Sequence, residues 1–169
     1  QLSSRLTSIG IAEDQRIIVY VGGFGPHKNL MMLVDVFAGL ASQAEFDDVR
    51  LVMVGEYRKE VFYSQVDALR AQIQRLGVED RVIFTGYLPD EELVNLLNLA
   101  AVLVLPSLME GFGLPAVEAA ACGCPVVATS ESPLPQLLGE GGLYVHPEEH
   151  DALMAALTEV LRSETLRQR

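Results

Sequence analysis

Six short apolar runs alternate with longer amphipathic segments along almost the whole chain. Each short run is apolar at consecutive positions, which is typical of strands buried on both faces of a sheet. The longer segments place apolar residues three and four positions apart, as a helix with one buried face does. This order predicts an α/β, Rossmann-like, three-layer domain in which helices cover both faces of a six-stranded parallel sheet. We expect strands at 17–21, 50–54, 81–85, 101–105, 125–128 and 142–145, and helices at 29–44, 59–76, 112–122, 134–138 and 148–162, with one more beginning at residue 89.

The length of 169 residues suits one domain, which we place over residues 1–169. Because 23 acidic residues outweigh 12 basic ones, for a net charge of −11, the chain has no general attraction for nucleic acid or anionic membrane. No apolar run approaches the ~20 residues of a membrane helix, and the first ten residues lack a signal-peptide layout. The two cysteines, Cys122 and Cys124, are too few for a disulfide scaffold and favour a reducing cytoplasm. An anionic ligand would therefore have to be held by a few local groups.

The segment after the first expected strand has the composition of a phosphate site. In parallel sheets ligands bind beyond the carboxyl ends of the strands. Here the first strand is followed by Gly22-Gly-Phe-Gly-Pro-His-Lys28. Small residues let the backbone approach a ligand closely, and a lysine beside the N-terminus of a helix can hold phosphate. The alternative is an ordinary tight turn with a solvated lysine, and this segment alone does not decide between the two.

The segment after the fourth strand carries two glutamates around a glycine-rich helix start. Glu110 precedes Gly111-Phe-Gly-Leu-Pro, and Glu118 follows about two turns later. The N–H groups of residues 112–114 would be free to bind a diphosphate, and the two carboxylates could accept hydrogen bonds from sugar and ribose hydroxyls. If most of the interval is helical, the two acids are ~8–12 Å apart along the axis. The alternative is a pair of solvated helix acids.

These motifs, taken together, resemble those of the large retaining glycosyltransferase family called group 1 or family 4. The two glutamates with seven residues between them resemble its E-x7-E motif. Four more segments resemble its other blocks in the same order: Tyr20-Val-Gly-Gly with Pro26-His-Lys28-Asn29, Val82-Ile-Phe-Thr-Gly86-Tyr-Leu, Ala121-Cys-Gly-Cys-Pro-Val-Val-Ala-Thr129 and Gly139-Glu-Gly-Gly-Leu-Tyr-Val145. The resemblance covers about residues 17–161, nearly the whole chain. It favours functional roles for both glutamates over the solvated alternative.

The resemblance implies the C-terminal, donor-binding half of a GT-B fold, with an N-terminal acceptor domain absent from this chain. It implies that Lys28 neutralises the diphosphate of a nucleotide sugar, that Glu110 contacts the sugar and that Glu118 binds the ribose. On this basis Lys28 and Glu110 are the candidate catalytic residues. The remaining candidate donor-binding residues are Gly22, Gly23, Tyr87, Leu88, Gly111, Phe112, Gly113 and Leu114.

The family usually works without a bound metal, so no metal or cofactor is expected. The glycine loop is similar to that of mannosyl-transferring members, which favours GDP-mannose as the donor, although base, sugar, acceptor and pathway are not identified. Many members carry arginine where this chain has Gly23, so Lys28 would be assisted only by His27. By itself the domain is expected to bind nucleotide and to catalyse little. Membrane contact of a longer enzyme would not come through this domain.

Two other functions stay open at this point. The first is a non-catalytic module that binds a nucleotide or sugar phosphate. The second is a dinucleotide-binding dehydrogenase domain, for which Glu56 after the second strand would be the ribose-binding acid. The second requires a G-x-G-x-x-G fingerprint after the first strand, and the chain has Gly22-Gly-Phe-Gly-Pro-His there instead.

Overall fold

The computed structural model describes residues 2–57 and 65–163, and it contains one six-stranded, fully parallel sheet. The strands are β1 (Arg16–Val21), β2 (Val49–Val54), β3 (Val82–Gly86), β4 (Val102–Leu105), β5 (Val126–Thr129) and β6 (Gly142–Val145), in the spatial order β3-β2-β1-β4-β5-β6. The predicted Rossmann-like class is confirmed, and each expected strand lies within one residue of its predicted bounds.

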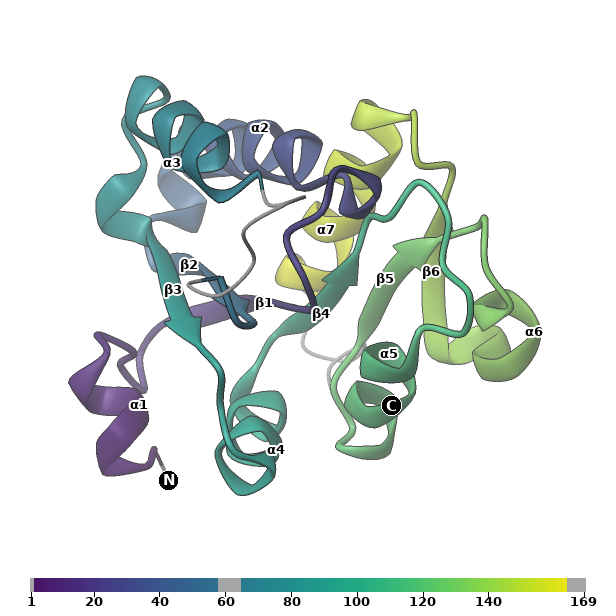
Figure 1. Ribbon diagram of the computed structural model, residues 1–169, viewed down its shortest axis with the longest axis horizontal. Coiled ribbons are helices and arrows are strands. Elements are labelled where there is room, and N and C mark those ends of the chain that lie inside the picture. Colours follow the sequence, from purple (N-terminus) through teal and green to yellow (C-terminus); the bar gives the residue numbers. More distant parts are fainter. Residues whose placement is uncertain (1, 58–64, 164–169) are drawn as a thin grey trace.

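Helices cover both faces of the sheet, which gives the three predicted layers (Figure 1). One face carries α2 (Leu30–Ala41), α3 (Val66–Arg75) and α7 (His150–Arg162), with α2 packed between the other two. The other face carries α4 (Asp90–Leu99), α5 (Leu114–Ala121) and α6 (Leu134–Leu138), with α1 (Ser4–Ser8) against α4. None of the helices in the described parts of the chain is long and apolar enough to cross a membrane.

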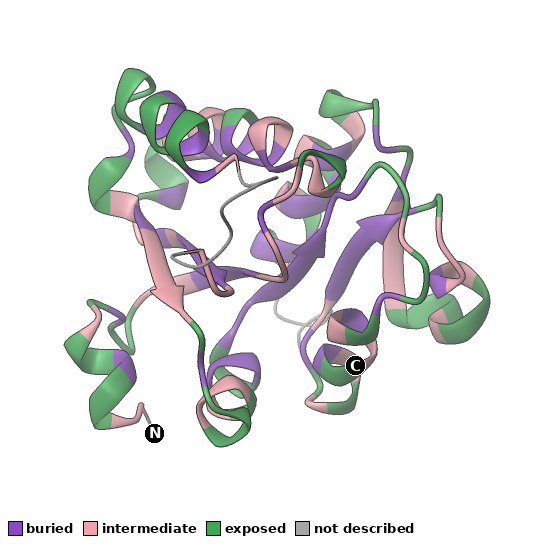
Figure 2. Ribbon diagram, viewed as in Figure 1, coloured by how far each residue is buried: buried purple, intermediate pink, exposed green. Residues whose placement is uncertain are grey.

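Burial follows the position of each strand in the sheet. The four inner strands are almost entirely buried, whereas the edge strands β3 and β6 are largely half-buried (Figure 2). This is why the inner strands are apolar at consecutive positions, since both of their faces lie under helices. The core is therefore one continuous apolar cluster on the two sides of the sheet.

Some helix bounds differ from those predicted. Helix α1 was not predicted, because five residues give too little periodicity to recognise. Helix α5 begins at Leu114 instead of residue 112, because Gly113 has a left-handed backbone (φ 77°) that cannot continue a right-handed helix. The helix expected at 59–76 is present as α3, and its predicted beginning lies outside the described residues.

The chain reverses its direction of winding between β1 and β4, which lie side by side in the sheet. From β1 the strands proceed outward to β2 and β3, and from β4 they proceed the opposite way to β5 and β6. The loops that follow β1 and β4 therefore lead to helices on different faces of the sheet. Ligands of open α/β sheets bind at such a switch point.

Candidate functional site

Buried aromatic side chains support the glycine loop after β1. The buried Tyr20 hydroxyl donates a 2.6 Å hydrogen bond to the carbonyl of Gly23. Phe24 is buried as well, and its ring lies 6.2 Å from that of Tyr20 and 5.9 Å from that of Phe84. Gly22 and Gly23 are thus fixed by the core, while the loop backbone stays half-buried at the carboxyl edge of the sheet. Sequence reasoning did not assign Tyr20 a role.

Lys28 is not a solvated lysine. It is the last residue of a short 3-10 turn, Pro26–Lys28, and only Asn29 separates it from α2. Its Nζ lies 3.3 Å from Oε2 of Glu110, and the two side chains are only 19% and 15% exposed. The residues come from the loops after β1 and β4, so the two predicted catalytic candidates meet at the switch point of the sheet.

Glu110 is also held by two other parts of the chain. Ser107 is fully buried and donates a 2.9 Å hydrogen bond from Oγ to the same Oε2 that faces Lys28. The backbone N–H of Glu110 donates to the carbonyl of Glu131, which lies in the loop after β5. Ser107 was missed as an individual residue. Its signal was a polar residue directly after a buried strand and three positions before a candidate acid.

The beginning of α5 offers backbone donors beside Glu110. In the described residues, no hydrogen bond is accepted from the N–H groups of Gly111, Phe112, Gly113 or Leu114. Gly113 is buried, and a Cβ there would lie 2.7 Å from Cδ1 of Leu134, so only glycine suits both its backbone and its surroundings. The side chains of Phe112 and Leu114 point to solvent. Unpaired N–H groups at the N-terminus of a helix suit an anion.

The other predicted residues, Glu118, Tyr87 and Leu88, form no hydrogen bond or ion pair with Lys28 or Glu110 in the described part of the chain. Glu118 is exposed on α5, and the interval from Glu110 is helical from Leu114 onward, so four of the seven residues between the two glutamates are helical. Tyr87 is 65% exposed in the loop after β3, where its carbonyl accepts a hydrogen bond from Arg5. Leu88 is 4% exposed and packs in the core, so only its backbone could border a base.

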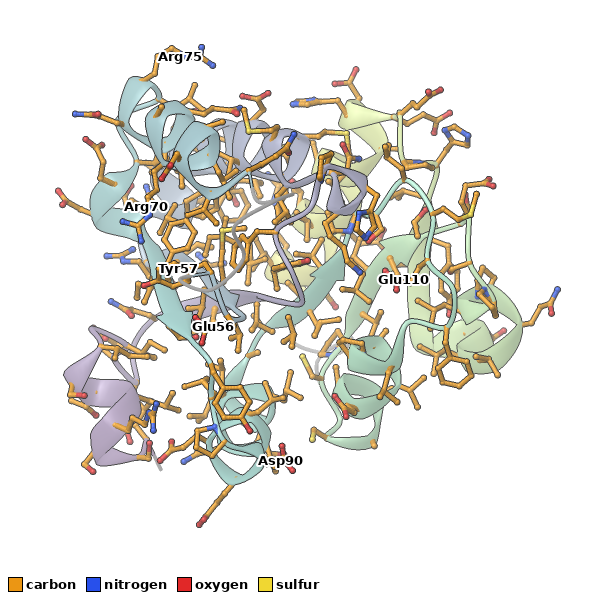
Figure 3. All side chains as sticks on the ribbon, in the orientation of Figure 1. Glu56, Tyr57, Arg70, Arg75, Asp90 and Glu110 are labelled. Atoms are coloured by element: carbon orange, nitrogen blue, oxygen red, sulfur yellow. The ribbon has the colours of Figure 1, made fainter. Side chains whose placement is uncertain are left out.

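Figure 3 shows how the charged side chains lie. Glu110 lies within the outline of the fold, whereas Arg75 extends outward from the end of α3. Glu56, the acid that a dehydrogenase site would use, follows β2 and is half-buried. Lys28 forms its ion pair with Glu110.

A hollow at the other end of the sheet does not belong to this site. Its volume is about 330 Å³, and it lies at the amino ends of β5 and β6, where Cys124, Gly142 and Val160 line it. Burial raises the pKa of the Cys124 thiol to about 12, so this cysteine is a neutral core residue at physiological pH. Lys28 and Glu110 lie at the opposite, carboxyl edge of the sheet, and they do not line the hollow.

Comparison with known proteins matches residues 6–169 to the family model described as Glycosyl transferases group 1. The O-antigen chain mannosyltransferase B of Escherichia coli is 33% identical over 154 residues, which are 91% of this chain and 39% of that protein. The sucrose-phosphate synthase of Thermosynechococcus elongatus has a TM-score of 0.82 and 29% identity, over 97% of this chain and 40% of that one. An Anabaena protein solved in complex with UDP and glucose has a TM-score of 0.81 and 27% identity, over 96% and 42%. The chain thus spans about two fifths of the length of these relatives.

Proposed function

Because this chain belongs to the glycosyl transferases group 1 family, we propose that it is the domain that binds the nucleoside diphosphate sugar in a retaining glycosyltransferase. The observation that carries the proposal is the meeting of Lys28 and Glu110 at the switch point, beside the free N–H groups at the beginning of α5. A cation and a row of backbone donors suit a diphosphate, and a carboxylate beside them suits sugar hydroxyls.

The same groups suggest how the bond to the leaving group would break. As the sugar leaves, negative charge develops on the nucleoside diphosphate. Lys28 and the N–H groups of residues 111–114 would stabilise that charge without a metal, because they are held in place before the reaction. Glu110 would orient the sugar through its hydroxyls. We assign no covalent nucleophile, since the mechanism needs none from the residues at this site.

The acceptor side of the reaction is proposed to lie in another domain of a longer protein. The relatives in the comparison are more than twice as long as this chain, which leaves room for such a domain. In this proposal residues 1–169 form a single donor-binding unit that catalyses little by itself. The low cysteine content favours a location in the cytoplasm. The dehydrogenase alternative is set aside because the chain belongs to a glycosyltransferase family.

Calorimetric titration with nucleotides tests the proposal. We expect UDP or GDP to bind and the corresponding nucleoside to bind much more weakly, because the diphosphate makes the charged contacts. A thermal-shift panel of UDP-, GDP- and ADP-sugars then identifies the base. GDP-mannose is the first conjugate to test, because one relative in the comparison is a mannosyltransferase. Equal affinities for a nucleoside diphosphate and its nucleoside would contradict the proposal.

The two glutamates are expected to respond differently to replacement by glutamine. Glu110→Gln should weaken binding of the nucleotide sugar. It should strengthen binding of the bare diphosphate, since Lys28 loses its carboxylate partner. Glu118→Gln should weaken both ligands by similar amounts, because ribose is common to them. We expect each variant to lose no more than about 1 kcal/mol of unfolding free energy, because neither side chain is part of the apolar core.

Calorimetric titration of both variants with GDP and GDP-mannose, or with UDP and UDP-glucose, gives the four affinities needed. A Glu110→Gln variant that lost as much affinity for the diphosphate as for the conjugate would contradict the proposal that Glu110 contacts the sugar. A Glu118→Gln variant that kept both affinities would remove Glu118 from the site and leave it a solvated acid.

A further inference from the structure

Three loops at the carboxyl edge of the sheet meet at the side chain of Asn29. Its amide Nδ2 donates a 2.9 Å hydrogen bond to the carbonyl of Pro106, in the loop after β4. The same nitrogen donates a 2.8 Å hydrogen bond to the carbonyl of Pro147, in the loop after β6. Asn29 itself belongs to the loop after β1. One amide group therefore joins three loops that are up to 118 residues apart in sequence.

The bond to Pro106 joins two positions that each lie next to a residue of the proposed site. Asn29 directly follows Lys28, and Pro106 directly precedes Ser107, whose hydroxyl holds Glu110. A backbone bond from the N–H of Leu108 to the carbonyl of His27 joins the same two loops. The distance between the Lys28 amine and the Glu110 carboxylate thus depends on how these two loops are tied together.

Asparagine is suited to this position for two separate reasons. Its backbone is left-handed (φ 59°), which among the non-glycine residues asparagine and aspartate adopt most readily. Its side-chain amide has two donor hydrogens, one for each carbonyl, whereas an aspartate carboxylate can only accept. Pro106 and Pro147 are both buried, so their carbonyls would lose these donors without easy replacement by water. Asparagine is also a common cap at the position before a helix, but the Asn29 side chain makes no capping bond to α2.

We propose that Asn29 is a positioning residue, which holds the Lys28 loop against the Glu110 loop and so sets the spacing between the cation and the carboxylate. This inference rests on the proposed function, since that spacing matters for a ligand that touches both groups. A nucleotide sugar spans Lys28 and Glu110, whereas a bare nucleoside diphosphate uses only the first. Loss of the two Asn29 hydrogen bonds should therefore weaken binding of the conjugate more than binding of the diphosphate.

The test uses Asn29→Gly, which keeps the left-handed backbone accessible and removes the side-chain amide with its two donors. Asn29→Asp keeps the shape and replaces the donors by a carboxylate, which also adds a negative charge next to Lys28. The matched control is Arg81→Met at the amino edge of the sheet, because Arg81 also ties separate segments together by donating to the carbonyls of Ala41, Phe46 and Val49. All three variants lose inter-segment hydrogen bonds, but only the Asn29 variants lose them beside the site.

Two measurements are made on each variant and on the unmodified chain. Calorimetry gives the affinities for GDP, GDP-mannose, UDP and UDP-glucose, and we expect Asn29→Gly to bind the accepted conjugate roughly tenfold more weakly, with a smaller loss for its diphosphate. Asn29→Asp should bind both ligands more weakly, because its carboxylate also repels the diphosphate. Amide hydrogen exchange reports on the loop directly, and the Leu108 N–H should exchange roughly tenfold faster in both Asn29 variants. Arg81→Met should lower the unfolding temperature and leave these affinities and this exchange rate unchanged.

Each result decides one question. If the Asn29 variants lose thermal stability, as Arg81→Met does, but keep wild-type affinities for the conjugate, Asn29 only stabilises the fold and the inference is overturned. Unchanged exchange at Leu108 overturns it too. If the unmodified chain binds none of the four nucleotides, the proposed function fails, and the exchange rates still show whether Asn29 holds the loops together.

Discussion

Replacing Lys28 by alanine should weaken the binding of a nucleoside diphosphate by about 1.5–3 kcal/mol, the range for a charge-assisted hydrogen bond. The loss has two physical causes. The variant lacks the amine that would face the phosphates, and it leaves the Glu110 carboxylate without the cation that now lies 3.3 Å away. An unpaired carboxylate close to a diphosphate adds repulsion. Calorimetric titration with GDP and UDP measures the effect.

Two further variants separate these causes. Arg75→Ala removes a positive charge from the exposed end of α3, so it controls for the change in net charge and should leave binding unchanged. The double variant Lys28→Ala with Glu110→Gln removes the repulsion as well as the amine, and it should recover part of the lost affinity. If Lys28→Ala bound as tightly as the unmodified chain, the diphosphate would not lie at Lys28.

Replacing Gly55 by alanine should lower the unfolding free energy by about 2–4 kcal/mol. A Cβ at this position would lie 2.0 Å from the carbonyl oxygen of Gly22, and a backbone atom cannot move aside as the end of a side chain can. Gly55 follows β2 and Gly22 follows β1, and the two strands are paired up to Val21 and Val54. The clash would therefore push the glycine loop away from the sheet, and diphosphate affinity should fall with stability.

Gly141→Ala is the matched control, since a Cβ there would be 3.9 Å from the nearest neighbouring atom and its backbone is not left-handed. We expect this variant to stay within about 0.5 kcal/mol of the unmodified chain. Chemical denaturation followed by circular dichroism measures both variants. Equal midpoints for Gly55→Ala and the unmodified chain would show that the two loops are not packed as closely as the structure places them.

Much of the site was predictable because its residues follow buried strands. Gly22, Lys28, Glu110 and Gly113 all lie just after β1 or β4, and the carboxyl ends of parallel strands are where such folds bind ligands. Tyr20, Ser107 and Asn29 were not assigned their roles, since each acts through a contact with a distant or differently oriented group. Leu88 stays a prediction as a neighbour of the base. The sequence did not show that its side chain is buried, because a single apolar residue in a loop gives no periodicity to tell core from surface.

The sequence by itself determined the alternation of strands and helices, the parallel sheet and the edge at which to look for a site. These features are local, since periodicity and glycine positions express them within a few residues. Only the tertiary structure decided the strand order, and with it the adjacency of β1 and β4 that brings Lys28 to Glu110 across 82 positions. It also gave the Asn29 amide two carbonyl partners in place of a helix cap. Such contacts depend on which strands become neighbours, and that is settled by packing the whole core and not by any one segment.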